Sequence, residues 1–212
     1  MLRPFTLTFY EYEDGDTLGK LCALLSCAPI FAVVSLATLI ASRRDLATAA
    51  FFVGHLLNEV LNAALKRALK QPRPPSQLRH GPTNYGMPSA HAQFCFFFAA
   101  YVALWARRHW RVGAAWRAAA VGAAAAGAAA VTYSRVYLHY HSVPQVLAGA
   151  AVGAASGAAW FSLVELALRP LFPALARSPL GRALWLRDCT QVHTLLEEYK
   201  AVAGAAGGGK AL

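Results

Sequence analysis

Long apolar stretches separated by short polar segments dominate this sequence. A helix needs about 20 predominantly apolar residues to cross the hydrocarbon core of a bilayer. Five stretches meet or approach that length, at residues 18–41, 46–66, 90–106, 112–133 and 143–168. Only 14% of the residues are charged, well below the proportion of about a quarter in soluble domains. The sequence therefore predicts an all-α, multi-pass membrane helical bundle of about five transmembrane helices.

A single membrane domain over residues 1–212 is the most economical organisation for five helices. The first stretch begins too late and runs too long for a signal peptide, so we expect it to remain in the mature protein. Several prolines and Trp185 follow the last stretch. We expect residues 169–212 to form interfacial segments on the cytosolic face, ending in a disordered Gly- and Ala-rich tail.

The net charge of +10 does not indicate a nucleic-acid partner, because the basic residues lie between apolar runs and not on one polar module. The four cysteines show no CxxC spacing, and three of them fall within apolar stretches. We interpret them as small buried hydrophobic residues, neither metal ligands nor a disulfide framework.

The distribution of positive charge predicts an orientation in the membrane. Five crossings place the two chain ends on opposite sides. Of the twenty Lys and Arg residues, eight fall on the side of the N-terminus and twelve on the other side. Positive charge collects on the cytosolic side of a membrane. The loops around Arg73 and Arg135, which share the N-terminal side, should therefore face away from the cytosol.

Carboxylates are missing from the middle of the chain. Between Val60 and Val164 there is no Asp or Glu, yet this interval holds ten Lys and Arg and five of the seven His residues. Magnesium and calcium sites need oxygen ligands, usually carboxylates, and an aspartyl nucleophile needs an Asp. A basic pocket with imidazoles instead suits a phosphate group, which a histidine can attack without a metal. We therefore expect no metal and no cofactor.

A polar stripe runs along the second stretch. Its members fall within an arc of roughly 100° at about 100° per residue, so they should face the bundle interior. They are His55, Asn58, Glu59, Asn62 and Lys66. Arg67, Lys70 and Arg73 continue the positive charge beyond it. At a helix end, such basic residues either anchor the helix by snorkelling or line a pocket.

The segment "SRVYLHYHSVPQVLAGA" places Arg135 after the fourth stretch and His141 just before the fifth. Ser142 and Gln145 form a plausible capping box at the start of that helix. Gln145 also lies one helical turn after His141, where its amide oxygen can reach the ring N–H. Capping and orienting His141 are both open roles for Gln145, and a loop histidine can also be a solvated surface residue.

The segment "YGMPSAHAQF" places Ser89 as the expected N-cap of the third helix and His91 in its first turn. Unpaired backbone N–H groups at such a position favour a bound anion. A histidine there can protonate a departing oxygen. The alternative is a polar residue that marks the membrane interface.

Together, three segments resemble the signature of the type-2 phosphatidic acid phosphatase superfamily. The signature consists of a lysine shortly before Arg-Pro, then Pro-Ser-Gly-His, then Ser-Arg followed at a fixed spacing by a histidine. The matching residues are Lys66, Arg73-Pro74, Pro88-Ser89-Ala90-His91, Ser134-Arg135 and His141. Flanking stretches, including "RPFTLTFYEYEDGD" and "PLFP", resemble the dolichyl-diphosphate phosphatase branch. The resemblance covers residues 3–190.

The resemblance implies a role for each matching position. His141 would be the nucleophile that forms a phosphohistidine, and His91 the general acid that protonates the leaving group. The phosphoryl oxygens would be bound at Lys66, Arg73, Ser89, Ala90 and Arg135. Two positions depart from the superfamily pattern: Ala90 replaces the usual glycine, and Gln145 replaces the aspartate that orients the nucleophile. We hypothesise that Glu59 supports His141 in its place.

The branch also implies a substrate and a location. The reaction would be metal-independent hydrolysis of dolichyl diphosphate to dolichyl phosphate and phosphate. It would recycle the lipid carrier of protein N-glycosylation at the lumenal face of the endoplasmic reticulum membrane, with no obligate protein partner. Phosphatidate or another lipid phosphate is the alternative substrate, because the same pocket would accept either headgroup. A catalytically silent lipid-phosphate-binding protein is a further alternative, which the pair His91 and His141 argues against.

Overall fold

The computed structural model describes residues 10–75 and 85–189, and within these ranges the regular elements are helices. The long helices are α1 (Thr17–Leu25), α2 (Ala28–Arg43), α3 (Leu46–Leu69), α4 (Ala90–His109), α5 (Ala114–Tyr137) and α6 (Val143–Leu163). A π-helical turn (Val164–Leu168), a 3-10 turn (Arg169–Leu171), α7 (Phe172–Arg177) and α8 (Pro179–Ala183) follow. The predicted all-α bundle is confirmed.

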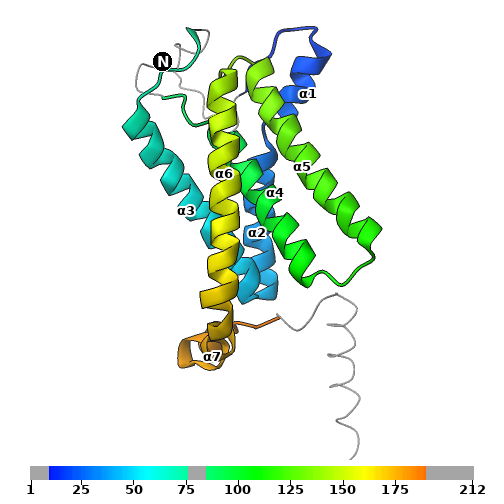
Figure 1. Cartoon of the computed structure of the whole chain (residues 1–212), viewed down its shortest axis with the longest axis vertical. Coiled ribbons are helices and arrows are strands. Elements are labelled where there is room, and N and C mark those ends of the chain that lie inside the picture. Colours follow the sequence, from blue (N-terminus) through cyan, green and yellow to red (C-terminus); the bar gives the residue numbers. More distant parts are fainter. Residues whose placement is uncertain (1–9, 76–84, 190–212) are drawn as a thin grey trace, which may run out of the picture.

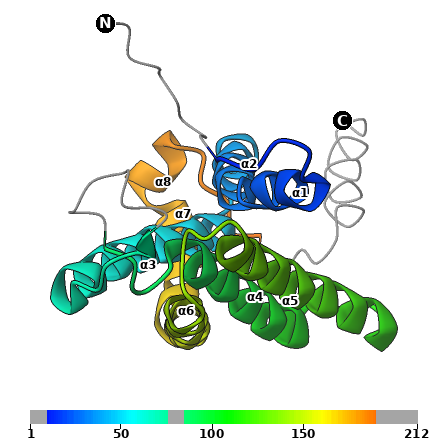
Figure 2. The same cartoon turned by 90° about the horizontal axis from the view of Figure 1, so that it is seen from above.

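The helices form a bundle around α4. Seen from above, α3, α4 and α5 lie in a row, with α6 on one face and α1 and α2 on the other (Figure 2). The end of α3, the end of α5 and the start of α6 lie at one end of the bundle, and α7 lies at the other (Figure 1). Segments distant in the sequence therefore meet at the first end.

The first predicted helix, residues 18–41, is in fact two helices, and this corrects the sequence prediction. α1 ends at Leu25 and α2 begins at Ala28. Pro29 has no N–H to donate to the preceding turn, which breaks the regular hydrogen-bond pattern. The N–H groups of Cys27 and Ile30 instead donate to the carbonyls of Leu24 and Cys27, both at 3.0 Å. These tighter bonds leave the carbonyl of Ser26 without its helical donor.

Local chemistry sets the other helix boundaries. The Asp45 carboxylate caps α3 by accepting from the Thr48 backbone N–H at 2.9 Å and its hydroxyl at 2.7 Å. The predicted capping box of Ser142 and Gln145 is present at the start of α6. The fourth predicted stretch begins as a helix at Ala114 instead of residue 112.

Close packing between α4 and α6 depends on glycines spaced four residues apart. A Cβ added to Gly149 would meet the carbonyl oxygen of Ser89, and one added to Gly153 that of Gln93. Gly157 faces the Phe97 carbonyl in the same way. The backbones of the two helices therefore approach closely, as a row of small residues allows.

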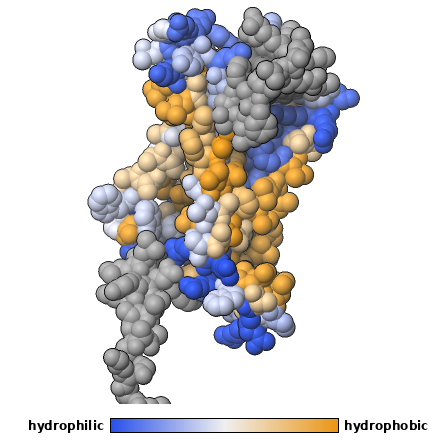
Figure 3. Space-filling view, turned by 180° about the vertical axis from the view of Figure 1, so that it is seen from behind, coloured by the Kyte–Doolittle hydropathy of each residue, from blue (hydrophilic) through white to orange (hydrophobic). Residues whose placement is uncertain are grey.

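Four helical segments in the described residues are long and apolar enough to cross a membrane: Thr17–Arg43, Leu46–Leu69, Ala114–Tyr137 and Val143–Arg177. α4, which the sequence predicts as a further crossing, is not among them. It lies in the centre of the bundle and carries polar side chains that face its neighbours. An apolar band covers the visible surface between two hydrophilic ends (Figure 3).

The chain after α6 turns back towards the α2–α3 corner. Arg187 pairs with this corner through backbone bonds, accepting from the Leu46 N–H at 3.0 Å and donating to the Arg44 carbonyl at 2.8 Å. Several apolar side chains here are exposed, including Leu180 and Trp185. The tail beyond residue 189 and the residues before Tyr10, for which the sequence also made predictions, lie outside the described residues.

Candidate active site

The polar stripe on α3 supports the segment that carries Ser89 and His91. The Asn62 amide donates to the Pro88 carbonyl at 3.2 Å and to the Gln93 side chain at 2.8 Å. Gln93 in turn donates to the Asn58 side-chain oxygen at 2.8 Å. All of these side chains are buried, which fixes the first turn of α4 against α3.

Glu59 does not follow the rest of the stripe. It lies on the exposed face of α3, and its carboxylate interacts electrostatically with Lys66. Among the described residues, Arg73, Arg135, Gln145 and Lys66 influence the pKa of His141, and Glu59 does not. The helix phase explains this, because Glu59 lies at the edge of the predicted arc.

His141 is buried between α5 and α6 and is held at both its backbone and its ring. Its backbone N–H donates to the Arg135 carbonyl at 3.1 Å. Its Nδ1 lies 3.2 Å from the amide oxygen of Gln145. Because that oxygen can only accept, Nδ1 carries the ring proton. The lone pair is then on Nε2.

Gln145 connects all three motif segments. Its side-chain nitrogen donates to the Pro72 carbonyl at 2.8 Å, directly before Arg73. Its backbone carbonyl accepts from the Ser89 N–H at 3.0 Å. The donation to Pro72 fixes which way the amide points, so its oxygen faces His141. The two roles predicted for Gln145, capping and contact with the ring, are therefore combined in one side chain.

Three cations surround the two histidines. Burial, and then the positive charges of Arg73, Arg135 and Lys66, lower the pKa of His141 to about 2. Burial and the same three cations lower the pKa of His91 to about 3 in the substrate-free site, and the negative charge of a bound phosphate group acts in the opposite direction. The structure thus brings both rings into one electropositive site. Arg67 and Lys70, which the sequence grouped with Lys66, are exposed and lie apart from it.

Residues of this site carry buried donors that have no hydrogen-bond partner in the described part of the chain. They are the Ser89 hydroxyl, the Arg73 Nε and the Arg135 Nε. Ser89 is the N-cap residue of α4, as predicted, but its side chain does not cap the helix. Buried polar groups in proteins are normally paired. Unpaired donors beside positive charges fit an anion with several oxygens. Ala90 follows Ser89 as the first residue of the helix.

Two residues at this site were not predicted from the sequence. The Ser26 carbonyl lies 3.1 Å from Nε2 of His91. The Ser26 hydroxyl accepts a hydrogen bond from Arg135 Nη1 at 2.8 Å. The Tyr10 hydroxyl lies 3.0 Å from the same His91 nitrogen. Pro29 shortly after Ser26 was the available signal for a helix break, and the Tyr-rich stretch at residues 9–12 was the signal for Tyr10.

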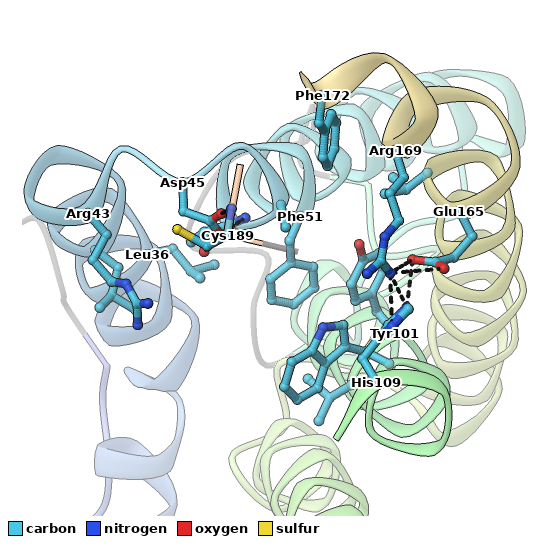
Figure 4. A pocket seen from close by; sticks show the side chains of 16 residues that line it. Leu36, Arg43, Asp45, Phe51, Tyr101, His109, Glu165, Arg169, Phe172 and Cys189 are labelled. Atoms are coloured by element: carbon cyan, nitrogen blue, oxygen red, sulfur yellow. Dashed lines mark hydrogen bonds and ion pairs between the residues drawn. The ribbon is translucent and has the colours of Figure 1, made fainter. Parts of the chain in front are cut away.

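A cavity of about 410 Å³ lies far from these histidines. It lies at the α7 end of the bundle, and its polar lining includes His109, Glu165 and Arg169 on one side and Arg43 and Asp45 on the other (Figure 4). The Glu165 carboxylate pairs with His109 at 2.8 Å and with Arg169 at 2.9 Å. The length of α6, roughly 30 Å at about 1.5 Å per residue, separates this cavity from the site.

The geometry agrees with what the chain is similar to. The PAP2 superfamily model matches residues 47–169, a range that includes the three motif segments, and the chain belongs to this superfamily. The relatives include Dolichyldiphosphatase 1 from Homo sapiens, 40% identical over 206 residues that cover 92% of this chain and 85% of the relative. Dolichyldiphosphatase from Saccharomyces cerevisiae is 34% identical over 213 residues, covering 93% and 87%.

A relative with a different name has a similar level of identity. Lipid phosphate phosphatase gamma from Arabidopsis thaliana is 36% identical over 205 residues, covering 93% of this chain and 90% of the relative. No solved structure matches the chain. The resemblance that the motifs indicated is therefore confirmed at the level of the superfamily and of its dolichyldiphosphatase members.

Proposed function

We propose that this chain is a membrane phosphatase that hydrolyses dolichyl diphosphate to dolichyl phosphate and phosphate. The observation that carries the proposal is the convergence of His91 and His141 on the same three cations. A site that only binds phosphate needs the cations, but it has no need of a buried imidazole with a free lone pair. The names of the relatives support a lipid diphosphate as the substrate.

The first step transfers the terminal phosphoryl group to the enzyme. His141 Nε2 attacks the terminal phosphorus, and the bond to the bridging oxygen breaks. His91 protonates that oxygen, so dolichyl phosphate leaves. Lys66, Arg73 and Arg135 neutralise the phosphoryl oxygens, and Ser89 donates its unpaired hydroxyl to one of them. The product on the enzyme is a phosphohistidine at position 141.

Water completes the reaction. His91 has lost its proton to the leaving group, so it now accepts one from the attacking water. The P–N bond breaks, phosphate is released, and His91 is again protonated for the next cycle. Each ring therefore returns to its starting state, and the balance needs no metal ion.

Trapping of the intermediate tests this mechanism directly. Protein incubated with substrate labelled on the terminal phosphorus and then quenched in alkali should carry one acid-labile phosphate. The label should be absent from His141→Ala and should accumulate in His91→Ala, where dephosphorylation lacks its base. Labelling of His141→Ala at the wild-type level would contradict the assignment.

A phosphatase of lipid monophosphates is the second candidate, because one relative is named for lipid phosphates in general. Release of phosphate from dolichyl diphosphate and from phosphatidate, measured side by side in detergent, separates the two. We expect a higher kcat/KM for the diphosphate. A preference for phosphatidate would favour the second candidate.

We also propose that the site faces the lumen of the endoplasmic reticulum and recycles the glycosylation carrier there. The excess of Lys and Arg on the opposite side of the bundle supports this orientation. In sealed microsomes, activity on a short-chain diphosphate added outside should be latent, and detergent should release it. Full activity before permeabilisation would place the site on the cytosolic face.

A further inference from the structure

Ser26, at the break between α1 and α2, contacts two parts of the site at once. It is fully buried. Its carbonyl lies 3.1 Å from His91 Nε2, and its hydroxyl accepts a hydrogen bond from Arg135 Nη1 at 2.8 Å. The same hydroxyl lies 3.0 Å from the Cys22 carbonyl, to which it donates. One residue thus holds the expected general acid with its backbone and a phosphate-binding cation with its side chain.

The helix break makes the carbonyl contact possible. In a continuous helix the Ser26 carbonyl would accept from Ile30 four residues later. Here Ile30 donates to Cys27 instead, at 3.0 Å, and Pro29 prevents the regular pattern from closing. The Ser26 oxygen therefore remains available to a partner from α4.

The contact determines which nitrogen of His91 carries a proton. A backbone carbonyl can only accept, so Nε2 must be the donor. The Tyr10 hydroxyl, 3.0 Å from the same nitrogen, then accepts a share of that N–H. Burial raises the pKa of the Tyr10 phenol, so the hydroxyl stays neutral at working pH. Nδ1 is the ring nitrogen left to exchange a proton with substrate.

We propose that Ser26 and Tyr10 are positioning residues that fix Nε2–H of His91, so that Nδ1 gives the proton to the leaving oxygen, and that the Ser26 hydroxyl aligns Arg135 on the phosphoryl group. The proposal rests on the proposed phosphatase function. During turnover Nε2 keeps its hydrogen throughout. Nδ1–H passes its proton to the bridging oxygen, and the neutral Nδ1 later takes one from water.

Both acceptors favour the protonated ring, because they receive hydrogen bonds from Nε2–H, which is a stronger donor in the imidazolium. Loss of either acceptor should therefore shift His91 towards its neutral form. A neutral His91 cannot protonate the leaving group, so activity should fall first at the alkaline end of the pH profile.

Tyr10→Phe tests the arm that acts on His91. It keeps the aromatic ring, which packs edge-on against His91 and Tyr140, and removes only the hydroxyl. With dolichyl diphosphate, kcat should fall about three- to tenfold at neutral pH, and the alkaline limb should move down by about half to one pH unit. KM should change little. Tyr12→Phe, an exposed neighbour in the same segment, should behave as wild type.

A double-mutant cycle separates positioning from general destabilisation. In a His91→Ala background, Tyr10→Phe should cost less than about twofold further, because its partner is gone. An unmoved alkaline limb in Tyr10→Phe, or a loss that multiplies fully with His91→Ala, would overturn this arm of the proposal.

Ser26→Ala tests the arm that acts on Arg135. Inorganic phosphate should inhibit this variant about tenfold more weakly than wild type, and KM should rise by a similar factor. The effect should disappear in an Arg135→Ala background. Ser42→Ala, which removes an exposed hydroxyl from α2, is the matched control. Unchanged inhibition by phosphate in a folded Ser26→Ala protein would overturn this arm.

These measurements distinguish the inference from the proposed function. If the wild-type protein hydrolyses no lipid phosphate, the proposed function is wrong. Binding of inorganic phosphate would still test whether Ser26 positions Arg135. An active phosphatase whose Tyr10→Phe and Ser26→Ala variants match wild type would retain the function and refute the positioning roles.

Discussion

At His141, a neutral amide stands where the superfamily pattern has a carboxylate. Gln145 holds the ring by accepting from Nδ1, and it adds no negative charge to offset the nearby cations. Burial and these cations lower the pKa of His141 to about 2, so the free ring is neutral at any working pH. The Nε2 lone pair is therefore always available, although the proposed phosphohistidine would gain less stabilisation from Gln145 than from a carboxylate.

A carboxylate at this position should change the pH dependence of the reaction. In Gln145→Glu the negative charge raises the pKa of His141, so the ring becomes protonated, and loses its nucleophilic lone pair, as the pH falls through the new value. We expect kcat/KM of the variant to fall between about pH 7 and pH 5 relative to wild type. The ratio of the two profiles removes the ionisation of the substrate. A constant ratio across this range would contradict the explanation.

Removal of the His141 ring and removal of the His91 ring should reduce activity to different extents. His141→Ala should abolish turnover, because it removes the lone pair proposed to attack the phosphorus. His91→Ala should cost about 100- to 10,000-fold in kcat, the usual range for general acid catalysis. His139→Asn is a suitable control, since His139 is exposed and has φ 56°, a conformation that Asn tolerates. Equal losses in all three variants would indicate misfolding.

The cations should act mainly through binding. Lys66→Ala and Arg135→Ala each remove a charge-assisted hydrogen bond to phosphate, worth about 1.5 to 3 kcal/mol. Inhibition by inorganic phosphate should weaken accordingly in both variants. Arg67→Ala, on the exposed face of the same helix, should leave this inhibition unchanged, and a loss there equal to that of Lys66→Ala would argue against a defined pocket.

At the level of elements, the contact between α4 and α6 sets the position of His91 relative to His141. α4 carries His91 in its first turn, and α6 begins two residues after His141. The glycine row on α6 lets the α4 backbone lie directly against it. The distance between the two histidines therefore depends on residues that contact neither of them.

A methyl group on this row should disturb both stability and activity. Gly153→Ala places a Cβ against the Gln93 carbonyl, and Gln93 anchors the start of α4. Overpacking of this kind costs about 1 to 3 kcal/mol. We expect a lower melting temperature in detergent and a reduced kcat. Gly122→Ala on α5, where the added Cβ meets no atom within 4 Å, should be neutral or stabilising.

The helices were more predictable than the break between two of them. Apolar length alone placed α3, α4, α5 and α6, because each must hide its backbone polar groups from lipid. The apolar stretch continues without interruption across Ser26 and Cys27, so one helix was predicted where two exist. The proline at position 29 is compatible with either a bend or a helix start, and only the partners of Ser26 distinguish them.

For the whole molecule, the sequence could predict which motif residues lie together at the candidate site, but it could not predict several of the residues that contact them. Lys66, Arg73, His91, Arg135 and His141 share a recognisable spacing. Tyr10 and Ser26 contact His91 although they are 81 and 65 residues away in the sequence, and no local sequence pattern predicts such contacts. Glu59 shows the converse, because a helical arc of roughly 100° includes residues at its edge that face outward.

The whole pocket should work without a divalent cation. Three cationic side chains already supply the positive charge that neutralises the phosphate oxygens, so a metal ion is not needed for this purpose. Treatment with EDTA should leave the rate unchanged, and added magnesium should not raise it. A strong loss in EDTA that magnesium restores would contradict the metal-free mechanism.

Gln145 also determines when the enzyme can become active. Its contacts reach the segment before Arg73, the start of α4 and His141, yet it belongs to α6, the last of the long helices in the described residues to leave the ribosome. Under the proposed mechanism, a nascent chain that has not yet inserted α6 would lack both the proposed nucleophile and the residue that holds the motif segments together. We therefore expect such a chain to be inactive on its lipid substrate while its own synthesis is under way.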